Sequence, residues 1–195
     1  MKKRTLSLKK LTQAVLKNGS REMTGRLRGA RVREALEKVL GEEKETLRVV
    51  LDFSGMGSID FSWADEVVAK MISRLWGGEY GEKFLVLKNL SASQAENIDV
   101  ALERKRLALL ITGPGGWRIA GSLNNYLIRT LNRVMEKKQL TPRELSEEEG
   151  IEINTSGTRL LNLYRRRLVV REERPTVGKD DFHRGRQYLY QSLLV

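Results

Sequence analysis

Two spacings of apolar residues alternate along the first part of the chain. The runs LRVVLDF (47–53) and KFLVLKN (83–89) are almost continuously apolar, which predicts strands covered on both faces. Between them, SWADEVVAKMISRLW (62–76) places apolar residues on one stripe at helical spacing. Similar spacing at 24–40 and 91–111 predicts two further helices. This alternation of strand and helix predicts an open α/β sheet.

A Gly/Pro-rich stretch, TGPGGW, interrupts this pattern at residue 112. Glycine and proline together mark turns and boundaries, so we expect a sheet domain at 1–112, a linker at 113–121 and a second domain at 122–195. WRIAG, inside the linker, reads either as a short strand or as part of the linker.

The second domain is expected to hold three helices and then two strands. Leucines four residues apart predict a helix at 122–138. Thr141 as cap, Pro142 in the first turn and Gly150 as stop frame a short second helix. A third helix is expected from residue 154 to 168, followed by the strand-like runs VVREE and RQYLYQSLL.

Composition narrows the chemistry. The 195 residues contain no cysteine and a single histidine, His183, so we expect no disulfide, no thiolate site, no Ser-His-Asp set and no His-rich metal site. No apolar run approaches the roughly 20 residues of a membrane helix. We therefore expect a cytoplasmic protein that is not an enzyme and uses no cofactor or metal. The net charge of +11, with 14 Lys/Arg against 6 Asp/Glu in residues 1–50, favours an anionic partner.

The C-terminal order of elements resembles the winged helix-turn-helix family over about 70 residues. SGTRLLNL (156–163), LVVRE (168–172) and the Gly-Arg before the last strand match its pattern, whereas Arg167 stands where Gly or Asn often ends the third helix. The resemblance implies duplex DNA binding, with the third helix in the major groove. The expected base-reading and phosphate-binding residues are Thr155, Ser156, Thr158, Arg159, Asn162, Arg165, Arg166, Lys179, Arg184 and Arg186. Because 139–195 holds 10 Lys/Arg against 9 Asp/Glu, a winged helix that docks protein is the alternative.

The N-terminal pattern resembles the STAS-like family, which includes anti-sigma factor antagonists. LDFSG (51–55) followed by SWADE (62–66) carries the resemblance over residues 5–108, with Trp where the family usually has Phe. Phe61 falls at the family's phosphoserine position, so the usual kinase switch is not expected. Ser62 is predicted to cap the helix. The resemblance implies a docking face at the helix start, formed by Phe61, Ser62, Trp63, Asp65 and Glu66.

The sequence thus predicts a cytoplasmic, dimeric DNA-binding transcriptional regulator, whose STAS-like domain mediates dimerisation or partner docking. Two other functions remain open. One is an adaptor that docks an anti-sigma-like kinase or another protein without binding DNA. The other is an RNA-binding protein that uses the basic N-terminal segment.

Overall fold

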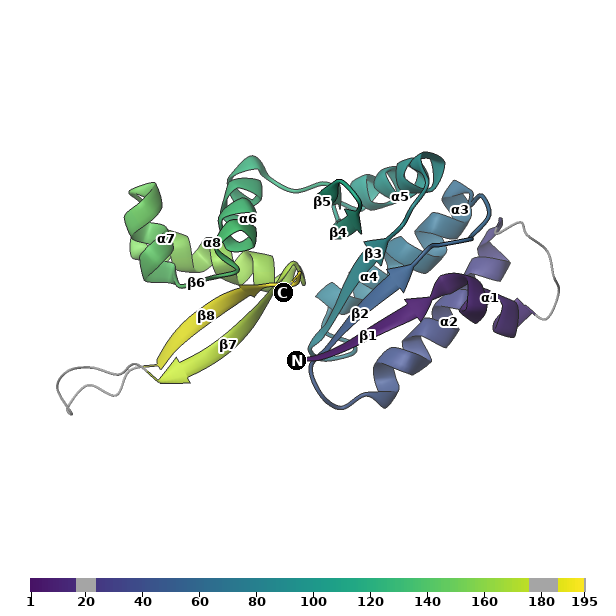
Figure 1. Ribbon diagram of the computed structural model, residues 1–195, viewed down its shortest axis with the longest axis horizontal. Helices are drawn as coiled ribbons and strands as arrows, with labels where there is room; N and C mark the ends of the chain where they lie inside the picture. The colour runs from purple at the N-terminus through teal and green to yellow at the C-terminus, as the bar shows by residue number, and fades with distance from the viewer. Residues whose placement is uncertain (17–23, 176–185, 195) are drawn as a thin grey trace. The chain divides into compact units, whose positions relative to one another are not determined.

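The computed structural model describes residues 1–16, 24–175 and 186–194 of the chain (Figure 1). The chain divides into two compact units, Met1–Leu123 and Asn124–Val195. The first unit is a mixed α/β unit with a five-stranded, mostly parallel sheet, as the alternating pattern predicts. Within the described residues, no helix combines the length and the apolar character that a membrane crossing needs.

The sheet of the first unit runs in sequence order, β1-β2-β3-β4-β5. The first four strands are parallel and β5 returns antiparallel to β4. Short side chains, Val and Leu, dominate β2 and β3, and both strands lie in the interior of the sheet. The strands are β1 (Lys2–Ser7), β2 (Leu47–Asp52), β3 (Lys83–Lys88), β4 (Ala108–Gly113) and β5 (Gly116–Gly121).

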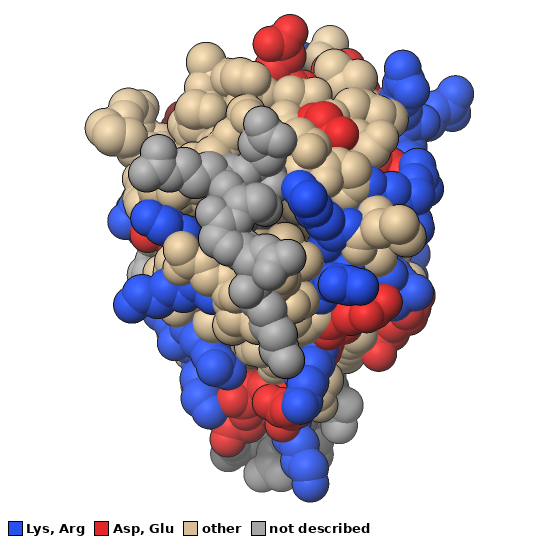
Figure 2. Space-filling model, turned by 90° about the vertical axis from the view of Figure 1, so that its right-hand side faces the viewer, with Lys and Arg blue, Asp and Glu red and all other residues tan. Residues whose placement is uncertain are grey.

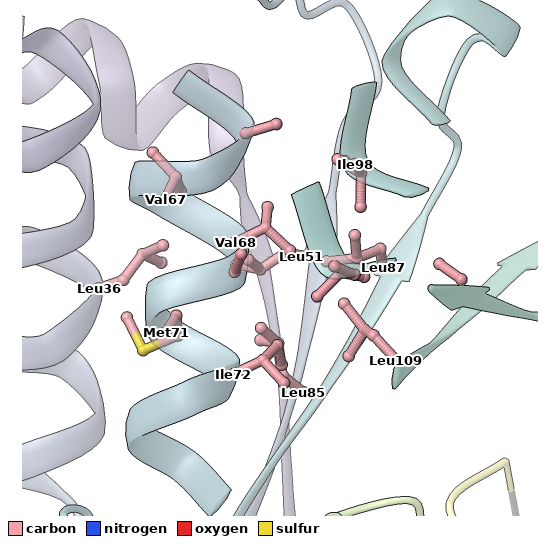
Figure 3. Packing of buried hydrophobic residues seen from close by; sticks show 14 of the residues in the cluster. Leu36, Leu51, Val67, Val68, Met71, Ile72, Leu85, Leu87, Ile98 and Leu109 are labelled. Carbon is pink, nitrogen blue, oxygen red and sulfur yellow. The ribbon is translucent and has the colours of Figure 1, made fainter. Parts of the chain in front are cut away.

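Helices connect the parallel strands. They are α1 (Leu8–Leu16), α2 (Arg26–Glu42), α3 (Phe61–Ala64), the π-helical turn η1 (Asp65–Ala69), α4 (Lys70–Trp76) and α5 (Ala92–Arg104). In Figure 3, the continuous segment η1–α4 lies between α2 and the sheet. Val67 and Met71 point towards Leu36 of α2, and the opposite side of the segment points towards sheet residues such as Leu51 and Leu85. This two-sided burial explains the dense apolar stripe in the sequence.

Two predictions for the region around residue 110 were wrong. The helix expected at 91–111 ends at Arg104, and residues 108–113 form β4. Arg106, which follows the end of the helix, has a φ of 54°. This left-handed conformation is usually adopted by Gly or Asn after a helix. The residues expected to form a linker, 113–121, instead close the β4–β5 hairpin. The alternative that WRIAG is a short strand is confirmed, because it lies in β5, where Ile119 and Ala120 pair with apolar residues of β4.

In its described residues, the second unit has three helices and a three-stranded antiparallel sheet. Its elements are α6 (Asn125–Lys137), β6 (Gln139–Leu140), α7 (Pro142–Glu149), α8 (Ile153–Arg165), β7 (Val169–Pro175) and β8 (Arg186–Ser192). The strand order is β6-β8-β7. Thr141 caps α7 in a capping box with Glu144, and Gly150 ends α7 in the left-handed conformation, as predicted.

Gly121, the last residue of β5, occupies a position that no other residue fits. Its φ is 80°, and a Cβ there would lie 2.3 Å from the carbonyl oxygen of Leu107 and 2.6 Å from Cβ of Leu102. We expect Gly121→Ala to lower the free energy of unfolding by about 3 kcal/mol, measured by urea denaturation. Gly115→Ala is the control, because a Cβ at Gly115 meets nothing within 4 Å and its effect should stay within about 1 kcal/mol. Equal stability of the two variants would contradict the hairpin packing.

Candidate functional site

The outer face of α8 carries a row of polar side chains. Asn154, Thr155, Thr158 and Arg165 are exposed, and Asn162 is half-buried between them. Their spacing of three and four residues puts them on one side of the helix, opposite the buried Leu160 and Leu163. Of the residues predicted to contact DNA, the structure therefore brings Thr155, Thr158, Asn162 and Arg165 together on one accessible face.

A shallow pocket of about 430 Å³ lies against this face. Five residues of α8 line it together with Tyr126 of α6, which is 37% exposed. Tyr126 was not predicted as a site residue, because the sequence shows it only as one position in a helix with leucines every four residues. The pocket combines amide, hydroxyl and aromatic groups, which can hydrogen-bond to a partner and contact its apolar edges.

Ser156, a predicted base-reading residue, is buried, so that prediction was wrong. Its hydroxyl oxygen lies 2.6 Å from the carbonyl oxygen of Pro142 and 2.8 Å from that of Ile153, so its single O–H is shared between these two acceptors. The side chain thus connects α8 to the first turn of α7. A small hydroxyl residue suits this place because the two helices approach each other here.

Arg159 lines the pocket beside the row, but its guanidinium is engaged within the unit. Its guanidinium donates to Glu149 at 2.8 Å and lies 5.5 Å from the ring centre of Tyr126, and only 17% of the side chain is exposed. The ion pair crosses from α8 to the end of α7. Arg159 therefore holds two helices and a ring in place, which corrects the prediction that it is a freely accessible base reader.

The remaining predicted basic contacts divide into two groups. Arg166 is half-buried at the end of α8 and has other interactions. Lys179 and Arg184 lie outside the described residues, and Arg186 begins β8 without a described side chain. Of the cations predicted to hold phosphate, Arg165 is thus the one placed in the exposed row.

Arg171 of β7 forms an aromatic stack that the sequence did not reveal. Its guanidinium carbon lies 4.4 Å from the ring centre of Tyr164 on α8 and 4.4 Å from that of Tyr188 on β8. Cation–π contacts of this kind favour a flat, fixed arrangement. The two tyrosines and the arginine come from different elements and form no local motif, so the sequence does not indicate that they stack. The stack fixes the end of α8 relative to the β7–β8 hairpin.

At the start of α3 in the first unit, the predicted cap was wrong. Asp60, not Ser62, is the N-cap, and its carboxylate accepts from the backbone N–H of Trp63 at 2.8 Å. The same carboxylate accepts from the N–H of Gly25 at 3.0 Å, just before α2. An aspartate caps as well as a serine, and its second oxygen lets it join two helix starts. Ser62 lies inside the helix and is half-buried.

Three residues of the predicted docking face are buried. Trp63 has no exposed surface and meets Phe53 edge to face, with ring centres 6.4 Å apart. Asp65 and Glu66 are 8% and 2% exposed. The predicted docking face therefore reduces to Phe61 and Ser62. Phe61 is half-buried under Arg104, whose guanidinium carbon lies 4.5 Å from the ring centre.

Glu66 is the centre of a buried ion-pair cluster. Lys70 lies 2.6 Å and Arg33 lies 3.4 Å from its carboxylate, and Arg26 approaches to 3.7 Å. Burial alone would raise the pKa of Glu66, but hydrogen bonding to Lys70 and the charges of Lys70 and Arg33 outweigh it and hold the pKa below its usual value. Gly29 permits this approach, because a Cβ there would lie 3.1 Å from Cβ of Glu66.

Asp65 extends the cluster to α5. Lys105, just after α5, lies 2.5 Å from its carboxylate, and Arg26 of α2 lies 3.6 Å away. The two neighbouring acids thus connect α2, η1–α4 and the end of α5. The turn that carries them is π-helical, a local irregularity that often accompanies special side-chain placement. No group of three or more metal-ligating side chains occurs among the residues that the structure describes.

Comparison with protein-family models and with curated proteins finds no match for the chain.

We expect Glu66→Gln to lower the free energy of unfolding by about 2–3 kcal/mol at pH 7, because Arg33 and Lys70 lose a buried charged partner. A carboxyl whose pKa is lowered by folding stabilises fully above its unfolded pKa, about 4.3, and this contribution is lost as the pH falls further. The difference between wild type and variant should therefore shrink below about pH 4 in denaturation experiments.

Glu79→Gln is the matched control for this prediction. Glu79 forms an exposed ion pair with Arg74 at 3.7 Å, so its removal should change stability by less than about 1 kcal/mol. A difference between wild type and Glu66→Gln that is constant with pH would show that the Glu66 charge does not contribute.

Proposed function

We propose that the chain is a DNA-binding transcriptional regulator whose second unit is a winged helix that reads duplex DNA with α8. The observation that carries the proposal is the order of elements α6-β6-α7-α8-β7-β8 with sheet order β6-β8-β7. This order places α8 as the third helix, directly before a two-stranded hairpin, which is the arrangement in which a helix-turn-helix presents its recognition helix.

The proposed recognition surface is the row Thr155, Thr158, Asn162 and Arg165, together with Tyr126. An α-helix fits the major groove, and amide, hydroxyl and guanidinium groups there can hydrogen-bond to base edges. Asn162 is suited to adenine and Arg165 to guanine or to a phosphate. Ser156 and Arg159 support this surface from behind rather than contacting DNA.

The first unit is proposed as the STAS-like part, which mediates dimerisation or partner docking. The support is its sheet, with a helix that begins directly after the loop from β2 and carries the SWADE motif. A single winged helix reads few base pairs, and a dimer doubles the contacted sequence.

An adaptor function is the second candidate, because acidic side chains border α8. Glu147, Glu148 and Glu152 are exposed near its N-terminal end, and Glu149 neutralises Arg159. Such charges oppose the approach of phosphate at that end and suit a basic protein partner. In this case the chain would dock an anti-sigma-like kinase or another protein.

Selection from a random duplex DNA pool at about 150 mM salt separates the two candidates. The full-length protein is expected to enrich a sequence motif, and two half-sites about one helical turn apart would report a dimer. Binding without enrichment would leave a nonspecific basic surface. Absence of binding would contradict the DNA proposal and favour the adaptor.

We expect the double variant Asn162→Ala, Arg165→Gln to weaken binding to the selected duplex by roughly 10- to 1,000-fold, because two base or phosphate contacts are lost. Fluorescence anisotropy with a labelled duplex measures the loss. The matched control is Asn132→Ala, Arg133→Gln on α6, where both side chains are exposed but lie outside the α8 row. An equal loss in both variants would contradict the assignment of the reading face to α8.

A further inference from the structure

The second unit does not account for the charge of the chain. Residues 1–123 carry 22 Lys/Arg against 15 Asp/Glu, a net charge of +7, whereas residues 124–195 carry 14 against 10, a net charge of +4. The excess of the first unit comes from its first 50 residues, which hold 14 Lys/Arg and 6 Asp/Glu. The first unit therefore carries most of the positive charge that an anionic partner would meet.

Most cations of this segment lie on β1, α1 and the first two turns of α2, and the first acid of α2 is the exposed Glu34. Neither residues 1–16 nor residues 24–33 contain Asp or Glu. The strand β1 is an edge of the sheet, α1 follows it directly, and α1 packs against α2. The exposed basic side chains on these elements are Lys2, Lys3, Arg4, Lys9, Lys10, Arg26, Arg28 and Arg31.

Part of this charge is already used inside the first unit. Lys2 pairs with Glu43 at 2.5 Å, and Arg26 reaches towards Asp65 and Glu66. Arg4, Lys10 and Arg31, in contrast, are exposed, and no ion pair to them is found within the described residues. Figure 2 looks onto the side of the first unit that carries α1 and the first part of α2, and it shows Lys and Arg side chains, with some Asp and Glu among them, on both sides of the grey segment.

The segment contains no ring on which a base could stack. Residues 1–52 have no Phe, Trp or Tyr, and the first aromatic residue is Phe53. Single-stranded nucleic acids are held largely by stacking on aromatic side chains, and protein interfaces are enriched in them. A surface with an excess of flexible cations and without aromatics is suited to the phosphate backbone of a duplex.

We propose that β1, α1 and the first half of α2 form a second DNA-contacting surface, which binds duplex phosphates without reading sequence. This inference rests on the proposed function, because it takes duplex DNA as the partner. The N-terminal basic surface, defined by Arg4, Lys10 and Arg31, adds affinity and salt dependence. The α8 row of the second unit supplies the sequence preference.

The test compares two full-length triple variants of equal charge. Arg4→Gln, Lys10→Gln, Arg31→Gln removes three cations of the N-terminal basic surface. Lys38→Gln, Lys44→Gln, Lys88→Gln removes three exposed cations elsewhere on the first unit, including one at the opposite end of α2. Affinity for the selected duplex and for an unrelated duplex is measured between about 50 and 200 mM KCl. Far-UV circular dichroism and thermal unfolding verify that both variants are folded.

The first variant is expected to bind both duplexes roughly 10- to 100-fold more weakly than wild type at about 100 mM KCl. The slope of log affinity against log salt should fall in magnitude by about 1 to 3, since each phosphate contact contributes about 0.9. The preference for the selected motif should not change. The control variant should keep a slope within about one unit of wild type.

Three outcomes would overturn the inference. Equal slopes for the two variants would show that the N-terminal basic surface does not contact DNA. A loss confined to the selected duplex would make it a reading surface. A loss of affinity for single- or double-stranded RNA, with duplex DNA binding unchanged, would make RNA its partner. Failure of the proposed function is distinguishable from these, because wild type itself would then bind no duplex DNA.

Discussion

The segment η1–α4 is buried on two sides, and the packing and the ion pairs of the first unit depend on this burial. Its apolar residues contact α2 on one side and the sheet on the other. Asp65 and Glu66 begin this segment, so their carboxylates are carried out of water with it. A buried carboxylate is unfavourable unless cations and hydrogen bonds compensate it. The cations come from both sides of the segment, from Arg26 and Arg33 on α2 and from Lys105 after α5.

The same constraint divides the basic residues of α2. Arg33 is buried with Glu66, whereas Arg31 faces away from the cluster and is exposed. The two arginines are close in sequence but have different physical roles. Arg33 compensates a buried carboxylate, whereas Arg31 adds positive charge to the surface of the unit. The excess charge available to an anionic partner is accordingly smaller than the composition suggests, and it comes from residues 1–16 and 24–33, which contain no Asp or Glu.

Much of the architecture was predictable from local sequence, because caps and periodicity are local. Thr141, Pro142 and Gly150 specify α7 by well-known end signals, and the apolar runs specify β2 and β3. The two errors near residue 110, the end of α5 and the expected linker, have separate causes. Arg106 adopts a left-handed conformation without Gly or Asn, so the end of α5 and the start of β4 had no local mark. The pairing of β5 with β4 is a tertiary contact. The Gly/Pro-rich composition of this stretch indicates a linker and does not indicate that pairing.

Within the candidate site, sequence could identify the helix but not the use of each side chain. Ser156 and Thr155 are adjacent and chemically similar, yet one donates to the carbonyl oxygen of Pro142 and the other is exposed. The choice depends on where α7 crosses α8, which no local pattern encodes. Glu149 likewise determines the position of Arg159 from another helix. Predicting which residues of a helix are exposed for recognition therefore requires knowledge of the elements that pack against the helix, as well as its periodicity.

Under the proposed function, the two units would meet two different requirements of a sequence-specific DNA-binding protein. Base discrimination needs short, well-positioned groups, and the row on α8 is held by Ser156, by the Arg159–Glu149 pair and by Arg171 between two tyrosine rings. Affinity for the phosphate backbone needs only positive charge near the duplex, which flexible lysines and arginines provide. In the proposed division, the α8 row would supply base discrimination and the N-terminal basic surface would supply affinity, so each property could change without disturbing the other. Substitutions on α8 would then alter which sequences are bound, whereas substitutions on β1, α1 and α2 would alter how strongly all of them are bound.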